Sequence, residues 1–174
     1  MKFVEGKISD INSGYILQIC NCTGIYSFGI SKEIEDVFSI SPYSSRKNFK
    51  GVSSKEDISF PGTIMILGNE DSPQIVNMFA QYNPGNFGIT DYFRFMLENA
   101  YGKDDPVVNV PDSDADREKY FNMCLEGLYD FFEFTGEEVV IHVPYSNSFP
   151  IESLRDFENR MNDSGVNLQM YMYC

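Results

Sequence analysis

The sequence predicts a three-layer α/β protein, in which helices cover both faces of a mixed, mostly parallel β-sheet. Three apolar runs of strand length, at residues 63–67, 74–80 and 139–143, are typical of strands buried on both faces. In the second half of the chain, such runs alternate with segments whose apolar residues have helical spacing. Because parallel neighbours need helical crossovers, this alternation indicates a layered sheet.

Each expected element follows from its own pattern of apolar residues and turn signals. Strands are expected at residues 2–7, 15–20, 63–67, 74–80, 139–143 and 168–173. Helices are expected at residues 29–39, from Thr90 or Asp91 to about Tyr101, from Ser113 through Phe132, and at 151–161. The stretch 44–60 is polar and non-periodic, and no element is assigned to it.

The length of 174 residues fits one domain, spanning 1–174, with a hydrophobic core of its own. The acidic, proline-containing stretch around 102–112 is expected to be a surface insertion in that domain. No repeat, transmembrane span or low-complexity tract interrupts the pattern. The chain is therefore expected to fold alone.

The chain carries a formal net charge of −13 and a pI near 4.3, and its basic residues cluster no further than pairs such as Arg46-Lys47. Neither nucleic acid nor an anionic membrane is expected as a partner, because phosphate backbones need a basic surface. A small phosphorylated ligand remains possible, since main-chain N–H groups and a helix N-terminus supply positive potential locally.

The four cysteines, Cys20, Cys22, Cys124 and Cys174, are expected to be free thiols in a reducing, cytoplasmic compartment. No basic and apolar leader pattern precedes the first strand. Cys20 and Cys22 have the spacing of half a metal site, but the only histidine, His142, lies in an apolar strand. We therefore expect no metal and no cofactor.

The loop at residues 21–30 is the main candidate site, because ligands of α/β sheets settle at the carboxyl ends of strands. It contains no charged side chain and has two glycines, Gly24 and Gly29, directly before a helix N-terminus that suits a phosphate. Lys32 in the first turn adds positive charge. The alternative is an ordinary strand-to-helix turn that needs its glycines for backbone reasons only.

Three segments, in order, resemble the macro-domain family over nearly the whole chain. Asn21, Gly24, Gly29 and Ile30 fit the family's first loop. Residues 75–82 resemble the strand and Asn-Met-x-x-Gln of a phage and bacterial branch similar to ADP-ribose 1''-phosphate phosphatases, followed by Asp91-Tyr92 here as in that branch. Residues 141–145 resemble the strand that enters the family's second phosphate loop.

This resemblance implies a macro-domain-like α/β/α sandwich that binds ADP-ribose or a related nucleotide, and a viral protein that counters ADP-ribose chemistry of a host. The ligand-binding residues that it implies are Ile8, Asn21, Thr23, Gly24, Tyr26, Ser27, Phe28, Gly29, Ile30, Tyr145, Ser146, Asn147 and Ser148.

The sequence departs from the family at three places. Lys7 replaces the Asp that contacts the adenine amino group, and lysine cannot accept that hydrogen bond, although Asp10 is a neighbouring acceptor. Ser27 and Phe28 replace a Gly and a variable residue, which gives the first loop more bulk. In the second loop, residues 146–150 contain no glycine.

Catalytic candidates are few, because hydrolysis near the distal ribose needs a positioned base or nucleophile. Asp91 and Glu152 are the nominated carboxylates, and Asn21 and Gln81 can position substrate or water. Three functions stay open: a hydrolase of ADP-ribose derivatives, a module that sequesters a nucleotide without catalysis, and a protein-interaction derivative with an altered pocket.

Overall fold

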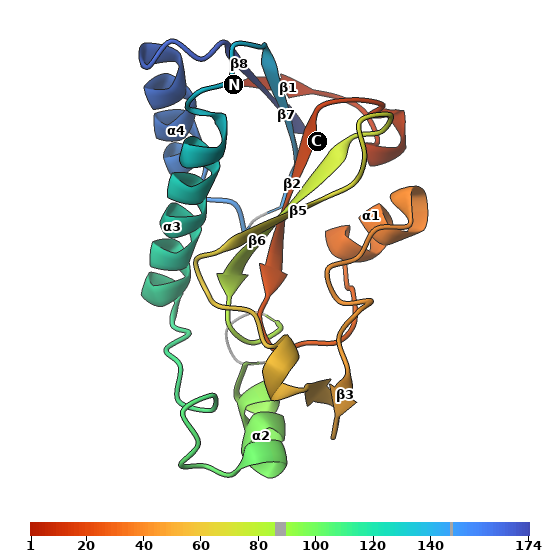
Figure 1. The fold of residues 1–174 in the computed structure, drawn as a ribbon, viewed down its shortest axis with the longest axis vertical. Coiled ribbons are helices and arrows are strands. Elements are labelled where there is room, and N and C mark those ends of the chain that lie inside the picture. The colour runs from red at the N-terminus through yellow and green to blue at the C-terminus, as the bar shows by residue number, and fades with distance from the viewer. Residues whose placement is uncertain (86–89, 147) are drawn as a thin grey trace.

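The computed structural model describes residues 1–85, 90–146 and 148–174, and these residues form eight strands, four α-helices and two short 3-10 helices (Figure 1). The strands are β1 (Lys2–Val4), β2 (Tyr15–Asn21), β3 (Asn48–Phe49), β4 (Val52–Ser53), β5 (Ile64–Leu67), β6 (Gln74–Gln81), β7 (Val139–Pro144) and β8 (Leu168–Tyr173). The helices are η1 (Ile8–Asp10), α1 (Ile30–Phe38), η2 (Lys55–Asp57), α2 (Thr90–Tyr101), α3 (Asp114–Phe132) and α4 (Ile151–Asp163).

Six strands form one sheet in the order β1-β8-β7-β2-β6-β5. Every neighbouring pair is parallel except β5 and β6, which are antiparallel. The sheet is therefore mixed and mostly parallel, which confirms the expectation from the sequence. β2 lies inside the sheet between β7 and β6, so the loop that follows it leaves from the middle of the sheet edge.

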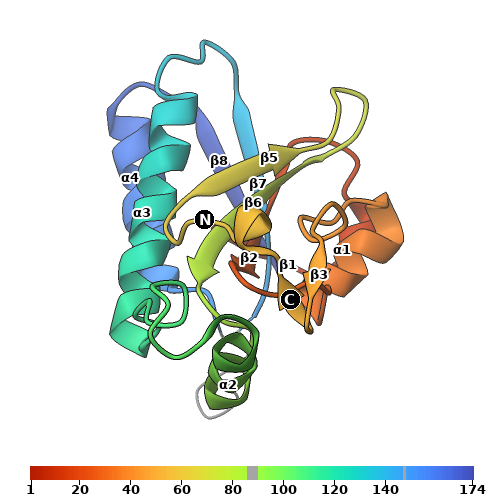
Figure 2. The same cartoon turned by 60° about the horizontal axis from the view of Figure 1, so that its bottom comes forward.

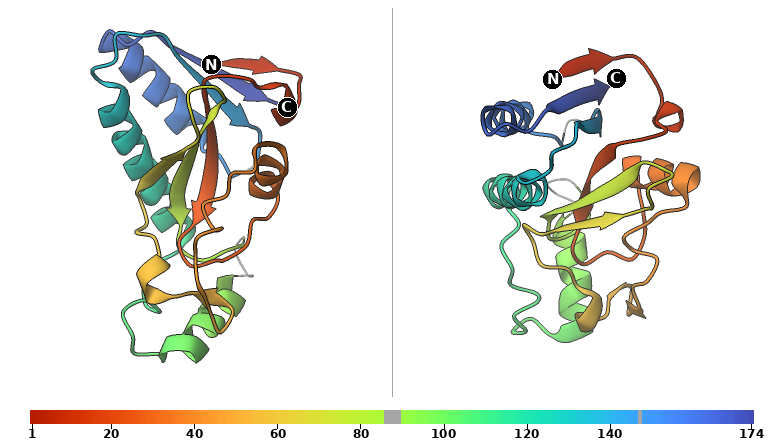
Figure 3. Two further views of the ribbon diagram at one scale, coloured as in Figure 1. Left: turned by 45° about the vertical axis from the view of Figure 1, so that its right-hand side comes forward. Right: turned by 45° about the horizontal axis from the view of Figure 1, so that its top comes forward.

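Helices cover both faces of the sheet, as predicted. α3 and α4 lie side by side on one face, and α1 lies on the other, where it packs on β2 and η1 (Figures 1 and 2). Both views of Figure 3 show α3 and α4 on one side of the sheet and α1 on the other. None of the helices in the described ranges is long and apolar enough to cross a membrane.

The period-2 pattern of β2 and β6 divides the core between the two faces. Leu17 and Met78 point to the α3 and α4 side and belong to the largest apolar cluster, whereas Ile16 and Ile75 point to α1 and pack with Ile34. Burial on both faces explains why these strands read as continuous apolar runs in the sequence.

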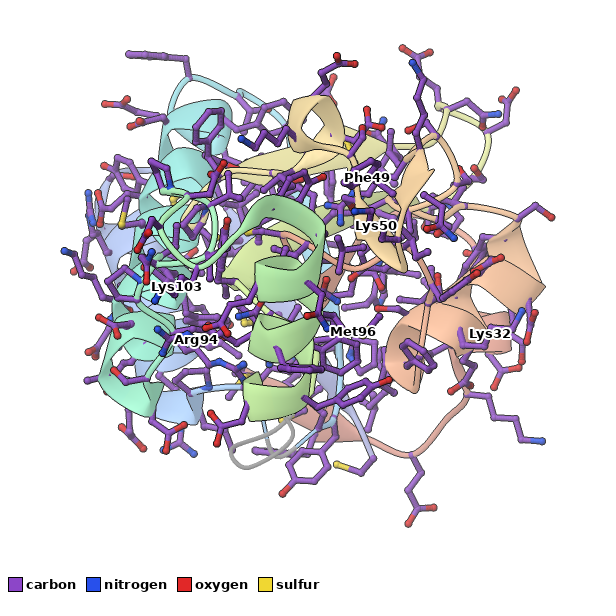
Figure 4. The ribbon with its side chains drawn as sticks, turned by 90° about the horizontal axis from the view of Figure 1, so that it is seen from below. Lys32, Phe49, Lys50, Arg94, Met96 and Lys103 are labelled. Atoms are coloured by element: carbon purple, nitrogen blue, oxygen red, sulfur yellow. The ribbon has the colours of Figure 1, made fainter. Side chains whose placement is uncertain are left out.

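A third apolar cluster lies beyond the carboxyl ends of β2 and β6, where α2 and the β3-β4 hairpin meet. Figure 4 shows this end from below, with Met96 on α2, Phe49 and Lys50 on the hairpin, and Lys32 farther out on α1. Its buried members are Cys20, Cys22, Tyr43, Val52, Phe79, Tyr82, Leu97 and Val108. The first loop is thus built on a small core of its own.

Three details of the prediction are wrong. The first strand ends at Val4, and the chain then turns into η1 instead of continuing to residue 7. β5 is an edge strand whose four residues are all half-buried, so it is not buried on both faces as predicted. The unassigned stretch 44–60 holds the β3-β4 hairpin and η2, whose strands are too short to show a period.

Candidate functional site

The first loop, residues 22–29, connects the end of β2 to the start of α1 and turns on Gly29. This glycine has φ 55° and ψ −129°, a conformation that side chains disfavour, and its carbonyl accepts hydrogen bonds from the N–H groups of Lys32 and Glu33. Apart from its two chain neighbours, no residue in the described ranges has a heavy atom within 4 Å of the position of a Cβ on Gly29. The N-terminus of α1, whose first N–H groups have no partner within the helix, therefore begins beside open space.

Asn21 and Gly24 close the inner part of this loop. The Asn21 Oδ1 accepts from the Gly24 N–H at 2.7 Å, and the Asn21 Nδ2 donates to the Tyr43 hydroxyl at 3.1 Å. A Cβ on Gly24 would lie 2.5 Å from that Oδ1 and 3.0 Å from Pro84. The amide of Asn21 is therefore used at both ends, which makes it a support of the loop.

Arg46 lies behind the loop and holds it to the hairpin region. Its guanidinium donates to the carbonyl oxygens of Gly24 at 2.6 Å and Asn21 at 3.2 Å, and to the Ser59 hydroxyl at 2.7 Å. Ser53 donates its hydroxyl to the same Gly24 carbonyl at 2.9 Å. Burial lowers the pKa of Arg46 from its ordinary value. Sequence reasoning missed this residue, because its hydrogen-bond partners lie 7 to 25 positions away.

The loop that follows β6 supports the first loop from its other side. Thr23 donates its hydroxyl to the Asn83 Oδ1 at 3.0 Å, and the N–H groups of Cys22 and Thr23 reach the Tyr82 carbonyl at 3.0 and 3.2 Å. The carboxylate of Asp112 accepts from the N–H groups of Tyr82 and Asn83 at 2.8 and 3.0 Å. Both loops therefore share one hydrogen-bonded network.

Arg117 completes this network, because its Nε and Nη2 both bind the Asp112 carboxylate, at 3.0 and 2.9 Å. The side chains of Arg117 and Asp112 are only 13% and 8% exposed. Arg117 also donates to the carbonyls of Gly85 and Asn83. No pattern in the sequence marks Asp112 for this role, since it looks like one more acid in an acidic stretch.

The outward part of the first loop carries two exposed aromatic side chains. Tyr26 is 61% exposed and Phe28 is 66% exposed, whereas Thr23 is buried. Ser27, between the aromatic residues, is half-buried, and its hydroxyl lies 3.0 Å from that of Ser41. Ile30 is half-buried at the first position of α1. Of the predicted loop residues, Tyr26, Phe28 and Gly29 are thus the ones that face solvent.

Ile8 is also placed by the structure, in η1 beside α1. Its side chain is buried in the cluster that α1 covers, and its carbonyl accepts from the Ile11 N–H at 3.1 Å. The Asp10 carboxylate accepts from the Lys7 N–H at 3.0 Å. Lys7 and Asp10 are both exposed, so an acceptor stands close to the position where Lys7 replaces the family's Asp.

The second predicted loop begins at Tyr145, whose N–H donates to the Tyr173 carbonyl at 2.7 Å and whose side chain is 47% exposed. Ser146 accepts through its carbonyl from the Phe149 N–H, and Ser148 is exposed. Asn147 lies outside the described residues. Tyr145 follows β7 and therefore leaves the same sheet edge as the first loop.

The nominated catalytic residues differ in their surroundings. Asp91 is exposed in the first turn of α2. Gln81 is half-buried at the end of β6 and accepts through its carbonyl from the Cys22 N–H. Glu152 pairs with Arg155 at 3.0 Å on the surface of α4. Lys32, expected to add positive charge, pairs with Asp36 at 2.7 Å.

The four cysteine thiols are unpaired, and three of them are buried. Burial raises the pKa of Cys20 and of Cys124 to about 12 and raises that of Cys22 as well, so these thiols stay protonated. Across the described parts of the chain, no group of three or more His, Cys, Asp or Glu side chains could hold a metal ion.

His142 is instead bound on both ring nitrogens within the protein. Its Nε2 lies 3.1 Å from the Ser13 carbonyl, which can only accept, so Nε2 carries the proton. Nδ1, 3.1 Å from the Tyr173 hydroxyl, is then the acceptor in the neutral ring. Burial lowers the pKa of His142 from its ordinary value of 6.5.

Because the folded protein binds this proton more weakly than the unfolded chain, the free energy of unfolding is expected to fall as the pH drops through 6.5. Above that pH the stabilisation is fully present. Urea unfolding between pH 7.5 and pH 5.5 should therefore show a decline that is smaller in His142→Gln. Parallel curves for the two proteins would contradict this assignment.

The geometry now defines a class: a three-layer α/β protein whose central strand leads through a glycine loop into an open helix N-terminus. No family model matches the sequence, and no curated protein does. Two solved structures, however, share its backbone.

One is a mutant of the macrodomain of Oceanobacillus iheyensis, with a TM-score of 0.53 and 12% identity over 98% of this chain and 82% of that chain. The other is a crystal structure of a protein from Bacteroides thetaiotaomicron, with a TM-score of 0.54 and 16% identity over 99% of each chain. The chain has the macro-domain fold, as its sequence predicts.

Proposed function

We propose that this protein binds ADP-ribose or a related nucleotide, with the diphosphate over Gly29 at the N-terminus of α1. The observation that carries the proposal is the open space at the Cβ position of Gly29, directly before α1, into which no described residue beyond its chain neighbours reaches. Main-chain N–H groups at such a terminus suit phosphate oxygens, even in a protein with a net charge of −13.

Tyr26 and Phe28 add the second part of the proposed site. Both rings are exposed within three positions of Gly29, where they can stack on a base or cover the diphosphate. Tyr145, from the loop after β7, offers a third exposed ring at the same edge of the sheet. Adenine selectivity in this proposal depends on Asp10, because Lys7 cannot accept from the adenine amino group.

The proposal is tested by isothermal titration with ADP-ribose, with AMP and NAD as comparison ligands. Chromatography of a mixture with ADP-ribose 1''-phosphate then separates binding from turnover. Released phosphate that disappears in Asp91→Ala would assign the hydrolase function to this carboxylate. Binding without turnover would assign the sequestering function, and the absence of heat with every nucleotide would overturn the proposal.

Gly29→Glu is expected to weaken ADP-ribose binding by about a hundredfold or more, because a carboxylate would face the phosphates at the helix N-terminus. The matched control is Gly165→Glu. Gly165 also has a positive φ, of 95°, and no described residue other than its chain neighbours comes within 4 Å of its Cβ position, but it precedes β8 at the opposite edge of the sheet.

The two variants carry the same added charge, each at a glycine with positive φ, so their difference in affinity reports the place of the charge. Circular dichroism checks that both are folded. Equal affinities of Gly29→Glu and Gly165→Glu for ADP-ribose would show that the diphosphate does not bind at the N-terminus of α1.

A further inference from the structure

Arg46 and Arg117 are the two half-buried arginines of this network, and they differ in whether a carboxylate binds their positive charge. Arg117 binds the Asp112 carboxylate through two nitrogens. The hydrogen bonds of Arg46 go only to main-chain carbonyls and serine hydroxyls, and among the described residues no carboxylate lies within ion-pair distance of it. The rings of Tyr43 and Phe79 lie 4.8 and 5.6 Å from its guanidinium carbon.

A cation without a directly bound carboxylate in this place has two effects on the first loop. It attracts the carbonyl oxygens of Gly24 and Asn21 to the inner side of the loop. It also leaves a positive potential directly behind the loop, in a chain that is otherwise strongly acidic.

Peptide geometry carries the first effect to the outer side. In a trans peptide the C=O and the following N–H point in opposite directions. Because the Gly24 carbonyl points inward to Arg46 and Ser53, the N–H of Ile25 points outward. The preceding N–H, that of Gly24, is already used by the Asn21 Oδ1.

We infer that Arg46 is a positioning residue for an anionic ligand: it holds the Gly24 carbonyl inward, so that the N–H of Ile25 faces the diphosphate. This inference rests on the proposed function and names the part of the nucleotide on which the residue acts. Arg46 itself does not touch the ligand, because its guanidinium is occupied by the inner side of the loop.

The test compares Arg46→Met and Arg46→Lys with the wild type. Methionine keeps the length of the side chain without its donors or charge, and lysine keeps the charge but cannot span the same carbonyl and hydroxyl acceptors. Arg160→Met is the matched control, because it removes the same charge from an exposed pair with Glu126 on α3 and α4. The ligands are ADP-ribose and adenosine, which lacks the diphosphate.

Arg46→Met is expected to weaken ADP-ribose binding at least about tenfold while adenosine binding changes by less than about twofold. Arg46→Lys should lie between Arg46→Met and the wild type, and Arg160→Met should equal the wild type. A role in folding alone would lower the folded fraction without changing the ratio of the two affinities. Unchanged ADP-ribose binding, or an equal loss for both ligands, would overturn the inference.

A wild-type protein that binds neither ligand would overturn the proposed function. Amide hydrogen exchange would then test whether Arg46 positions the first loop. The Gly24 N–H should be protected in the wild type and should lose protection in Arg46→Met, with the core amide of Ile141 unchanged. Loss at Gly24 alone would retain Arg46 as the element that sets the loop. Equal protection of the Gly24 N–H in the wild type and in Arg46→Met would show that Arg46 does not position the loop.

Discussion

Gly24→Ala is expected to lower the free energy of unfolding by about 2–4 kcal/mol, the combined cost of overpacking and of one broken buried hydrogen bond. The added Cβ would lie 2.5 Å from the Asn21 Oδ1, which accepts from the Gly24 N–H. Either the loop or the amide must move, and Pro84 at 3.0 Å blocks the other side. Urea unfolding followed by circular dichroism measures the loss.

Gly127→Ala is the matched control, since it adds the same methyl group inside α3. Its Cβ would meet Ile64 at 3.7 Å, an ordinary contact, so we expect a gain of about 0.5–1 kcal/mol from helix propensity. Opposite signs for the two variants are the expected result. An unchanged free energy of unfolding in Gly24→Ala would mean that the loop tolerates displacement of the Asn21 side chain.

Asp112→Ala is expected to lower the free energy of unfolding by about 3–5 kcal/mol, the usual cost of breaking a buried ion pair from one side. The variant would leave the Arg117 guanidinium without its carboxylate, and the N–H groups of Tyr82 and Asn83 without their acceptor. Thermal and urea unfolding should both show the loss.

The comparison for Asp112 is Glu126→Ala, which breaks the pair with Arg160. Both of those side chains are at least half exposed, so solvent screens the pair and its removal should stay within the error of the measurement. A similarly small effect for Asp112→Ala would show that water reaches Arg117 and replaces the carboxylate.

Most of the fold could be predicted from the sequence, because its elements follow from strong local patterns. Ser113 begins α3 as predicted, with its hydroxyl accepting from the Asp116 N–H. β6 is a continuous apolar run, and it is buried on both faces. The β3-β4 hairpin could not be predicted, because two strands of two residues each have no period and are held by contacts distant in sequence.

The candidate site could be predicted only in part. Gly24 and Gly29 stand out because glycines before a helix are visible in the chain itself. Arg46, Asn83 and Asp112 were missed, because their importance lies in hydrogen bonds to groups that are 22 to 60 positions away in the sequence. Asn21 stays a predicted ligand contact or positioning residue, and its side-chain amide binds the Gly24 N–H and the Tyr43 hydroxyl.

The way in which the first loop is supported has a consequence for how this protein can diverge. The loop is held from behind by Arg46, so Tyr26 and Phe28 on its outer side contribute little to its path. If the proposed site is correct, mutations at these two positions are expected to change ligand preference while the backbone stays where it is. A protein built in this way can exchange the outer chemistry of its loop residue by residue and keep its fold.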